Sequence, residues 1–418
     1  MPKPKRLGGA TGGSKCMSKS MQNLGRAKET DVSAPHVSVI IPLYYAEEYV
    51  DALLTQLRTQ PLENIEIICV IDGSPDATLD IVKKHAEADS RMQWIYQENA
   101  GAGAARNAGL ALAAGEYLSF IDADDLYDAQ FLTKMYEAAK KHDADLVVCQ
   151  FKHVDCKTGA IEQNDGFRPD RVPTDTVFAS QDLTNPFSDI FVGPINKLYR
   201  REMVEKEGLR FSTTMVANDN FFVLCSIVSA QRIVAIQDSL IEVRRFVNSN
   251  SVSSNRARHT EDMFTSFQDL YAWLVQHGLY EQYHSYYVKA WTDAFHYNAT
   301  YDRNERFVET AARILACEEP WTSMDDKELQ RETRLDTGFI RLKKLILARQ
   351  PDTDARALEL RRSENEEAVV QDVVSILNTQ YGKKLSERSS IVSGAVTHLK
   401  NNGIRHSAAR FASRIKRG

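Results

Sequence analysis

The sequence predicts an α/β fold built on a mostly parallel, doubly wound sheet. Apolar strand-like runs alternate with helix-like segments from residue 37 to residue 151. These runs are apolar on both faces, which is typical of parallel strands covered by helices on either side. Each parallel pair needs a crossover, and the intervening helices supply it. From about Glu261 onward the pattern predicts helices alone.

Three strands and two helices are expected in the first part of this alternation. Val37–Leu43 (VSVIIPL) and Ile65–Ile71 (IEIICVI) are β-branched runs, and Met92–Tyr96 predicts a third strand. Ala46–Gln60 has apolar residues at helical spacing. The second helix should follow Ser74-Pro75-Asp76 and run to about residue 88, because these residues offer an N-cap, a first-turn proline and an acid near the helix dipole.

The alternation continues with two more strands and two more helices. Ala104–Ala114 is rich in Ala and Leu and is closed by Gly115, which predicts a helix. Tyr117–Ile121 predicts the fourth strand and Asp145–Phe151 (DLVVCQF) the fifth. A helix over about Ala129–His142 should connect them.

The later part of the chain is less regular and then helical. Residues 152–217 hold several prolines, and a helix over Asp219–Ala230 and a strand over Arg232–Ile236 follow. Aromatic residues at helical spacing between Phe264 and Phe295 indicate a helical core rather than a ligand platform. We expect a disordered basic segment at 1–36, an α/β domain at 37–255, a helical region at 256–398 and a basic amphipathic tail at 399–418.

Composition indicates a globular protein without a membrane span. The chain has 418 residues, of which 43% are hydrophobic and 26% charged, and this balance is typical of soluble domains. No apolar run reaches the roughly 20 residues that a spanning helix needs. No apolar signal segment follows the basic N-terminus, so we expect a cytoplasmic protein. None of the six cysteines forms a CxxC pair, which favours reduced thiols over a disulfide framework or zinc site.

The net charge of −5 conceals two basic ends. Residues 1–36 carry seven Lys or Arg against two acids, and residues 399–418 carry six basic residues and no acid. The body of the chain is therefore acidic, which argues against a nucleic-acid partner. The basic tail could contact an anionic membrane surface, giving peripheral attachment at the inner face, or it could be a solvated tail or a docked surface helix.

Carboxylates cluster where the predicted strands end. Ligands of doubly wound sheets bind beyond the carboxyl ends of the strands. Asp72 ends the second strand, and Asp122, Asp124 and Asp125 follow the fourth. Crowded carboxylates repel one another unless a cation or a ribose hydroxyl satisfies them, and Mg²⁺ or Mn²⁺ prefers such oxygen ligands. The alternatives are a solvated loop or ordinary helix capping.

Two further motifs could carry chemistry. The glycine-rich loop 99–109 resembles a dinucleotide fingerprint, but it follows the third strand and has Arg106 at the sixth position, so we reject that interpretation. Arg106 could face phosphates near a helix N-terminus or form a structural ion pair with a strand-end carboxylate. Asp219 could be a general base or simply a first-turn acid.

Taken in order, these motifs resemble those of family 2 glycosyltransferases with the GT-A fold. The resemblance covers about residues 37–253, and residues 98–125 are its most specific part. The motifs are PLYY with Glu48, IDGSPD (71–76), ENAGAGAARNAGLALAAGEYLSFIDADD (98–125), NKLYRREM (196–203) and NDNFF (218–222). The chain departs from the family at Tyr45, where Asn is usual, at Asn218, where Glu is usual, and at Ile71, where a paired acid is usual.

The resemblance implies a nucleotide-sugar-dependent transferase and assigns roles to individual residues. Asp219 resembles the catalytic base, Asp124 the ligand of Mn²⁺ or Mg²⁺, and Asp122 the carboxylate nearer the ribose. Asp72 resembles the residue that binds a uracil-type base. The remaining donor contacts that it implies are Pro42, Tyr44 and Glu48 in the pocket wall, and Arg106, Lys197 and Arg245 on the phosphate side. Loss of the usual Glu at position 218 removes a like charge that would raise the pKa of Asp219.

The expected function is inverting transfer of a sugar to a hydroxyl of a glycan or lipid-linked acceptor, with a UDP-sugar as the default donor. The expected context is cell-envelope or capsular polysaccharide synthesis. The alternative is a domain that only binds nucleotide sugar while the helical region mediates assembly. A nucleotidyltransferase is disfavoured because no basic glycine-rich loop follows the first strand. The sequence does not identify the sugar, the acceptor, the linkage, the oligomeric state or the role of the C-terminal helices.

Overall fold

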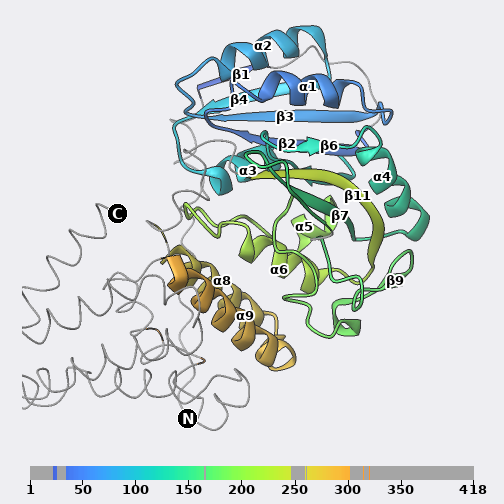
Figure 1. Cartoon of the computed structure of the whole chain (residues 1–418), viewed down its shortest axis with the longest axis vertical. Helices are drawn as coiled ribbons and strands as arrows, with labels where there is room; N and C mark the ends of the chain where they lie inside the picture. The colour runs from blue at the N-terminus through green and yellow to red at the C-terminus, as the bar shows by residue number, and fades with distance from the viewer. Residues whose placement is uncertain are drawn as a thin grey trace, which may run out of the picture. The chain divides into compact units, whose positions relative to one another are not determined.

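The computed structural model describes residues 22–25, 34–163, 166–245, 259, 261–301, 314 and 320 (Figure 1). The chain divides into two units, Met1–Ala290 and Trp291–Gly418. The first unit holds the sheet, its flanking helices and every predicted site residue.

One mixed sheet forms the centre of the first unit. Its strands lie in the order β1-β4-β3-β2-β5-β10-β7-β11-β6, with β8 paired to β7 and β9 to β11. The strands are β1 (Gln22–Gly25), β2 (Val37–Leu43), β3 (Ile65–Asp72), β4 (Met92–Gln97), β5 (Tyr117–Phe120), β6 (Leu126–Tyr127), β7 (Leu146–Asp155), β8 (Ile161–Gln163), β9 (Val177–Phe178), β10 (Lys197–Arg200) and β11 (Ile233–Arg245). Strands β4, β3, β2 and β5 are mutually parallel, whereas β10 runs antiparallel to both of its neighbours.

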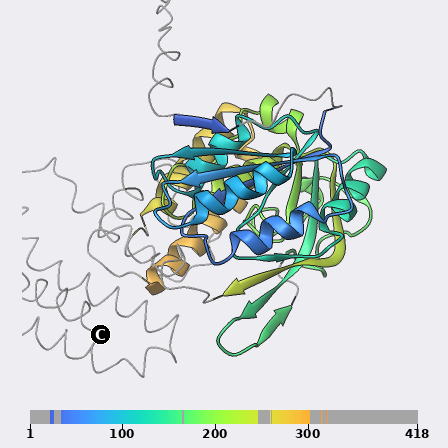
Figure 2. The same cartoon turned by 90° about the horizontal axis from the view of Figure 1, so that it is seen from above.

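Helices cover both faces of the parallel strands. The described helices of the chain are α1 (Val50–Arg58), α2 (Thr78–Ala88), α3 (Ala102–Leu110), α4 (Phe131–His142), α5 (Arg201–Lys206), α6 (Asn220–Ser229), α8 (Asp262–Gln276) and α9 (Tyr280–Tyr301), with a 3₁₀ turn at Ser180–Asp182. Helices α1 and α2 lie on one face of β2–β4, and α3 lies on the other (Figures 1 and 2). This arrangement explains why these strands are buried on both sides.

The alternation of side chains along β2 separates the two faces. Val39 and Ile41 pack with Leu53 and Leu57 of α1 in the main apolar core. Ile40 points the opposite way, and an added Cβ at Gly109 of α3 would lie 2.5 Å from its Cγ2. Because successive side chains of a strand alternate between faces, one run of β-branched residues serves both layers.

An aromatic cluster occupies the α3 face beside β10. Phe120 of β5 contacts Tyr199, Phe211 and Phe222, with ring centroids 4.8–5.8 Å from its own. Phe211 stacks on Phe222 at 4.1 Å. Such pairs contribute about 0.5–1.5 kcal/mol each beyond the apolar area that they bury. The cluster therefore fastens α6 and the loop before it to the sheet.

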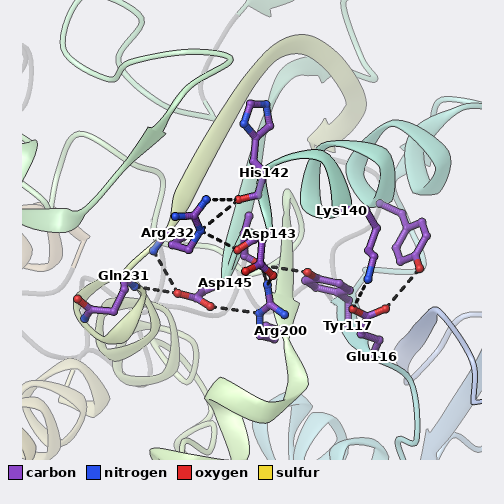
Figure 3. Close-up of polar contacts among 11 residues, drawn as sticks. Glu116, Tyr117, Lys140, His142, Asp143, Asp145, Arg200, Gln231 and Arg232 are labelled. Carbon is purple, nitrogen blue, oxygen red and sulfur yellow. Dashed lines mark hydrogen bonds and ion pairs between the residues drawn. The ribbon is translucent and has the colours of Figure 1, made fainter.

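A polar network fixes β10 at the edge of the sheet where β7 and β11 begin (Figure 3). Arg200, at the end of β10, donates to the Asp145 carboxylate at 3.1 Å and to the Ala144 carbonyl at 2.9 Å. Asp145 also accepts the backbone N–H groups of Gln231 and Arg232 at 3.0 and 3.1 Å. The network thus joins β7, β10 and β11 at one point.

Helices α8 and the first part of α9 complete the unit. The α8 face formed by Phe264, Phe267, Leu270 and Leu274 is buried, and α8 packs on α6. The Tyr287 hydroxyl of α9 donates to the Phe267 carbonyl at 3.2 Å. Across the described ranges, every helix is too short or too polar to cross a bilayer.

The predicted α/β class is confirmed, and several details differ from the expectation. The strand expected over Arg232–Ile236 is β11, which continues to Arg245. The sheet is mixed because β10, which lies in the segment expected to be irregular, inserts antiparallel between β5 and β7. The segment expected to be disordered contains β1, which pairs antiparallel with β4 and covers an otherwise unpaired edge. The basic tail at 399–418 and most of the region from 302 onward lie outside the described residues.

Candidate functional site

Four of the predicted site residues lie at the carboxyl ends of β2, β3 and β5. Tyr44 follows β2, Asp72 ends β3, and Asp122 and Asp124 follow β5. Because these three strands are parallel neighbours, their carboxyl ends meet at one edge of the sheet. The polar residues at these strand ends are therefore neighbours at the edge of the sheet where ligands of such sheets bind.

The acidic loop after β5 is held in place from β11. The Arg244 backbone N–H donates to the Asp125 carboxylate at 3.0 Å, and the Arg244 guanidinium donates to the Asp124 carbonyl. Burial raises the pKa of Asp125 well above its usual range, and the charges of Asp122 and Asp124 raise it further. Asp125 is thus a structural member of the loop, while the side chains of Asp122 and Asp124 are the two available to a ligand.

The surroundings of Asp124 disfavour its ionised carboxylate, which a bound cation would stabilise. Burial raises its pKa to about 6, and the neighbouring charge of Asp122 adds to the rise. A bound divalent cation would reverse both effects. Within the described ranges there is no group of three His, Cys, Asp or Glu that could by itself hold a metal. The donor set therefore fits a cation such as Mg²⁺, which is usually held by one or two carboxylates together with substrate phosphates.

Arg106 of α3 joins the acidic loop to the loop that carries Asp219. Its guanidinium donates to the Asp122 carboxylate at 2.8 Å and to the Asn218 side-chain oxygen at 2.9 Å. The side chain is 6% exposed and lies over the Phe211 ring at 5.4 Å. The structure thus bears out the ion pair that the sequence analysis weighed for Arg106, and it adds Asn218 as a second partner.

Asp219 stands at the N-cap of α6, at the end of a tightly folded loop over residues 211–219. Both backbone groups of Phe211 bond to the Asn107 side chain at 2.8 Å. The Ser212 N–H donates to the Asn218 carbonyl at 2.9 Å and closes the loop on itself. The charge of Asp219 also raises the pKa of buried Tyr199, although burial is the larger cause. Asp219 is therefore presented by a loop rather than by a strand end.

Asp72 organises the glycine-rich loop before α3. Its carboxylate accepts from the Gln97 side chain at 2.7 Å and from the backbone N–H groups of Ala100 and Gly101 at 2.9 Å. The Asn99 side chain donates to its carbonyl at 2.9 Å. Asp72 is 2% exposed. Within the described ranges, its carboxylate bonds to the 97–101 segment, which it holds at the carboxyl end of β3.

Two exposed tyrosines directly follow β2. Tyr44 and Tyr45 are 50% and 42% exposed, and their rings meet edge to face at 4.7 Å. Tyr45 has a φ of 50°, which a bulky residue rarely adopts. Pro42 is half-buried in β2 beside them. Glu48 is exposed and accepts the Tyr49 hydroxyl at 2.9 Å.

Side chains that follow β3 hold the segment 44–47 after β2, called the tyrosine loop from here on. The N–H groups of Tyr45, Ala46 and Glu47 donate to Ser74 Oγ at 2.7 Å, Thr78 Oγ1 at 3.0 Å and Asp76 Oδ2 at 3.2 Å, respectively. The loops that follow β2 and β3 are therefore bonded together over three successive residues.

The two other basic residues expected on the phosphate side, Lys197 and Arg245, differ from each other in burial and in their partners. Lys197 is fully buried, and its amine donates to the Phe191 and Gly193 carbonyls at 2.6 and 2.7 Å and to the Asn196 side chain at 2.8 Å. Burial lowers the pKa of Lys197 to about 7, an effect that the charges of Cys149 and Asp219 oppose. Arg245 is exposed and pairs in register with Asp155 near the end of β11.

Sequence reasoning missed Arg244, which contacts the acidic loop where Arg245 was expected to approach the phosphates. The alternation of side chains along a strand was the available signal, because adjacent arginines must point to opposite faces. Asn107 was also missed. Its contacts with Phe211 span 104 residues of sequence, and no local pattern reveals them.

Comparisons with known proteins agree with the motif order. A family model described as "Glycosyl transferase family 2" matches residues 38–208. "Putative glycosyltransferase EpsH" of Bacillus subtilis (strain 168) is 31% identical over 264 residues, 60% of this chain and 73% of that protein. "Uncharacterized glycosyltransferase EpsJ" of the same strain is 30% identical over 249 residues, 59% of this chain and 71% of that protein.

Among solved structures, S. aureus TarS 1–349 in complex with UDP-GlcNAc is similar with a TM-score of 0.47 and 19% identity. The alignment covers 75% of this chain and 90% of that one.

Proposed function

Because the chain belongs to glycosyl transferase family 2, we propose that it is an inverting enzyme that transfers a sugar from a nucleotide donor to an acceptor hydroxyl. The family predicted from the sequence motifs is confirmed, and with it the assignment as a glycosyltransferase. The donor type, the stereochemical course and the acceptor are the proposed parts.

The observation that carries this proposal is the link through Arg106. One guanidinium contacts both Asp122, in the acidic loop, and Asn218, the residue before Asp219. Displacement at an anomeric carbon needs charge neutralisation on the leaving diphosphate and a base on the opposite side of the sugar. The Arg106 link supports such an arrangement because it ties the residues for both tasks to one rigid helix.

Asp124, with Asp122 beside it, would hold the Mn²⁺ or Mg²⁺. A bound cation would supply positive charge beside the departing diphosphate. The raised pKa of Asp124 supports this role, because a cation would compensate the burial and the neighbouring charge that cause the rise. Asp122, held by Arg106, would accept a hydrogen bond from the ribose.

Asp219 would act as the general base. Its carboxylate would take the proton from the acceptor hydroxyl as that oxygen attacks the anomeric carbon. Direct displacement of this kind inverts the configuration and needs no covalent enzyme intermediate. Asn218, where the family usually has Glu, places no second negative charge next to this base, which would keep the pKa of Asp219 from being raised by a like charge.

The nucleotide would lie beside the tyrosine loop. We propose that the exposed Tyr44 ring stacks on the base, with Pro42 and Glu48 contributing to the pocket wall. Asp72 would contribute by holding the 97–101 segment, in addition to the predicted contact with a uracil-type base. Lys197 and Arg245 keep their predicted roles near the diphosphate as proposals, and Arg106 would act on the donor through Asp122.

We propose a UDP-sugar as the donor and a glycan or lipid-linked hydroxyl as the acceptor, in cell-envelope or capsular polysaccharide synthesis. The name of one relative supports a polymer as the acceptor: the "Poly(ribitol-phosphate) beta-glucosyltransferase" of Bacillus spizizenii is 28% identical over 207 residues. A cytoplasmic enzyme with peripheral membrane contact through 399–418 would suit a lipid-linked acceptor.

The first experiment is a donor panel. UDP-, GDP- and dTDP-sugars are incubated with the full chain and Mn²⁺ or Mg²⁺, and nucleotide release is measured. We expect release from one donor that depends on the metal and is lost in Asp124→Ala. Asp219→Ala should retain donor binding, measured by calorimetry with UDP and Mn²⁺, while transfer to acceptor falls at least a hundredfold.

Other outcomes separate the alternatives. Asp128→Ala, an exposed acid in the segment after β6, is the matched control and should behave as wild type. Heat on UDP binding without any release or transfer, across the acceptors tried, would support the alternative of a domain that only binds nucleotide sugar. No heat and no release from any donor would contradict the proposed function.

A further inference from the structure

We propose that Asp262, the first residue of α8, is a positioning residue for the catalytic base. It would act on the 211–219 loop, called the base loop from here on, rather than on the substrate. This inference rests on the proposed role of Asp219. Asp262 lies beyond the 38–208 segment that the family model matches, so the helical region would contribute to the reaction itself.

The contact between Asp262 and the base loop is specific. One carboxylate oxygen, Oδ2, accepts the backbone N–H of Met215 at 2.8 Å and that of Val216 at 3.0 Å. A single anionic acceptor with two converging N–H donors forms charge-assisted hydrogen bonds, which are roughly twice as strong as neutral ones. The contact spans 46 and 47 residues of sequence, and Val216 lies only three residues before Asp219.

The base loop needs such a restraint because its backbone is unfavourable. Ala217, between Val216 and Asn218, has a φ of 55°. Left-handed backbone is disfavoured for residues with a Cβ, so the conformation persists only where surrounding contacts impose it. Asp262 fixes the two residues immediately before Ala217, and Arg106 fixes Asn218 immediately after it. The turn that aims Asp219 is therefore held from both sides.

Asp262 itself is rigidly placed. The next two residues of α8, Met263 and Phe264, are each 1% exposed, and the buried face of the helix continues to Leu274. An acid in the first turn also suits the helix dipole. Helix α8, which carries Asp262, packs on α6, which begins directly after Asp219. The packing of these two helices therefore fixes the position of the Asp262 carboxylate relative to Asp219.

The test compares Asp262→Ala and Asp262→Asn with a matched control in the full chain. Glu281→Ala removes an exposed first-turn acid from α9, a helix of the same kind, at a position with no contact to the base loop among its described hydrogen bonds. The measurements are kcat for transfer, donor affinity by calorimetry with UDP and Mn²⁺, and amide hydrogen exchange across residues 212–219.

We expect Asp262→Ala to lower kcat about tenfold, because small misplacement of a reacting group is costly. Donor affinity should stay within about twofold, because the donor carboxylates are held from β5 and Arg106 rather than from α8. The amides of Met215 and Val216 should exchange faster as their acceptor is lost. Asp262→Asn keeps one acceptor oxygen and should show a smaller loss of the same kind, about threefold. Glu281→Ala should match wild type.

The proposal is overturned if Asp262→Ala keeps both wild-type kcat and wild-type exchange in the base loop. Should that variant fail to fold, Asp262→Asn decides, and unchanged exchange and kcat in it would equally overturn the proposal. If donor affinity and kcat fall together, Asp262 acts as a general structural residue, which also contradicts a positioning role. If wild type shows no transfer, the proposed function fails, whereas faster exchange without loss of UDP binding still identifies the restraint on the loop.

Discussion

The donor side and the base side of the site are positioned by different means. The donor-side acids, Asp72, Asp122 and Asp124, end or follow parallel strands, and the register of the sheet brings them together. Asp219 sits on a loop whose shape depends on side chains from α3 and α8. The register of the sheet sets the backbone from which the donor-side acids project, whereas the placement of Asp219 depends on the side chains that restrain its loop.

Two polar links between separate segments of the chain lie at opposite edges of the sheet, and the first of them joins the two sides of the site. At the site, Arg106 bonds to Asp122 on one side and Asn218 on the other. At the far edge, Arg200 and Asp145 connect β7, β10 and β11 (Figure 3). Breaking the first link should therefore affect chemistry and stability together, while the second contributes to the frame of the sheet.

The largest effect is expected from Arg106→Met. The change removes a buried guanidinium and leaves Asp122 and Asn218 without their shared donor, which should lower the free energy of unfolding by about 3 kcal/mol. Transfer should fall at least a hundredfold, because both the acidic loop and the base loop lose their common anchor. Urea denaturation and kcat for transfer measure the two losses.

Lys134→Met is the matched control for that variant. It also replaces a cation by methionine, but at an exposed ion pair with Asp238, where a loss of at most about 1 kcal/mol is expected. An Arg106→Met protein with wild-type transfer would show that the two sides of the site are positioned independently.

The next effect is steric and tests how closely α3 meets the base loop. A Cβ at Gly103 would lie 2.0 Å from the Ser212 carbonyl oxygen and 3.0 Å from Asn218 Cβ. Gly103→Ala should therefore displace the loop, lowering the free energy of unfolding by about 2–3 kcal/mol, with kcat reduced more than donor affinity. Gly208→Ala is the comparison, since that glycine has a φ of 62° and open space around it, and only about 1 kcal/mol of backbone strain is expected. Equal losses in the two variants would contradict a tight contact at Gly103.

The same contrast explains what the sequence could and could not predict. The buried runs of β2, β3 and β5 have a strong local pattern, so their ends and the acids on them follow directly from it. Strand β10 has four residues and gains its place from partners in β5 and β7, so no local pattern reveals it. The same holds for the contact between Asp262 and the base loop, because its partners lie 46 and 47 residues apart in the sequence.

The third prediction concerns pH and the donor side alone. Burial and Asp122 raise the pKa of Asp124 to about 6, so its carboxylate is largely protonated at pH 5. Mn²⁺ affinity in the presence of UDP should fall about tenfold from pH 7 to pH 5, because the proton competes with the cation. Calorimetry at the two pH values measures it, and Asp124→Asn should flatten the difference.

The raised pKa of Asp124 also predicts how the free energy of unfolding depends on pH in the absence of metal. The folded pKa lies above the ordinary value of about 3.9, so the folded state holds the Asp124 proton more tightly than the unfolded state does. This contribution is present below about pH 4 and is lost as the pH rises through about 6, and a divalent cation should restore it. Mn²⁺ affinity that is equal at pH 5 and pH 7 would exclude Asp124 as the ligand.

The smallest effect is expected from Tyr45→Asn in the loop after β2. Asn tolerates left-handed backbone better than Tyr does, and its N–H would still donate to Ser74 Oγ. The fold should therefore be unaffected or slightly stabilised, while the edge-to-face contact with Tyr44 is lost, a contact worth about 0.5–1.5 kcal/mol.

If that contact orients Tyr44 for the base of the donor, the donor KM should rise about threefold with kcat unchanged. Tyr45→Phe keeps the ring and should keep the KM. A KM that is unchanged in Tyr45→Asn would mean that Tyr44 needs no partner, and that the donor side is fixed entirely by the strand ends and by the bonds between the loops after β2 and β3.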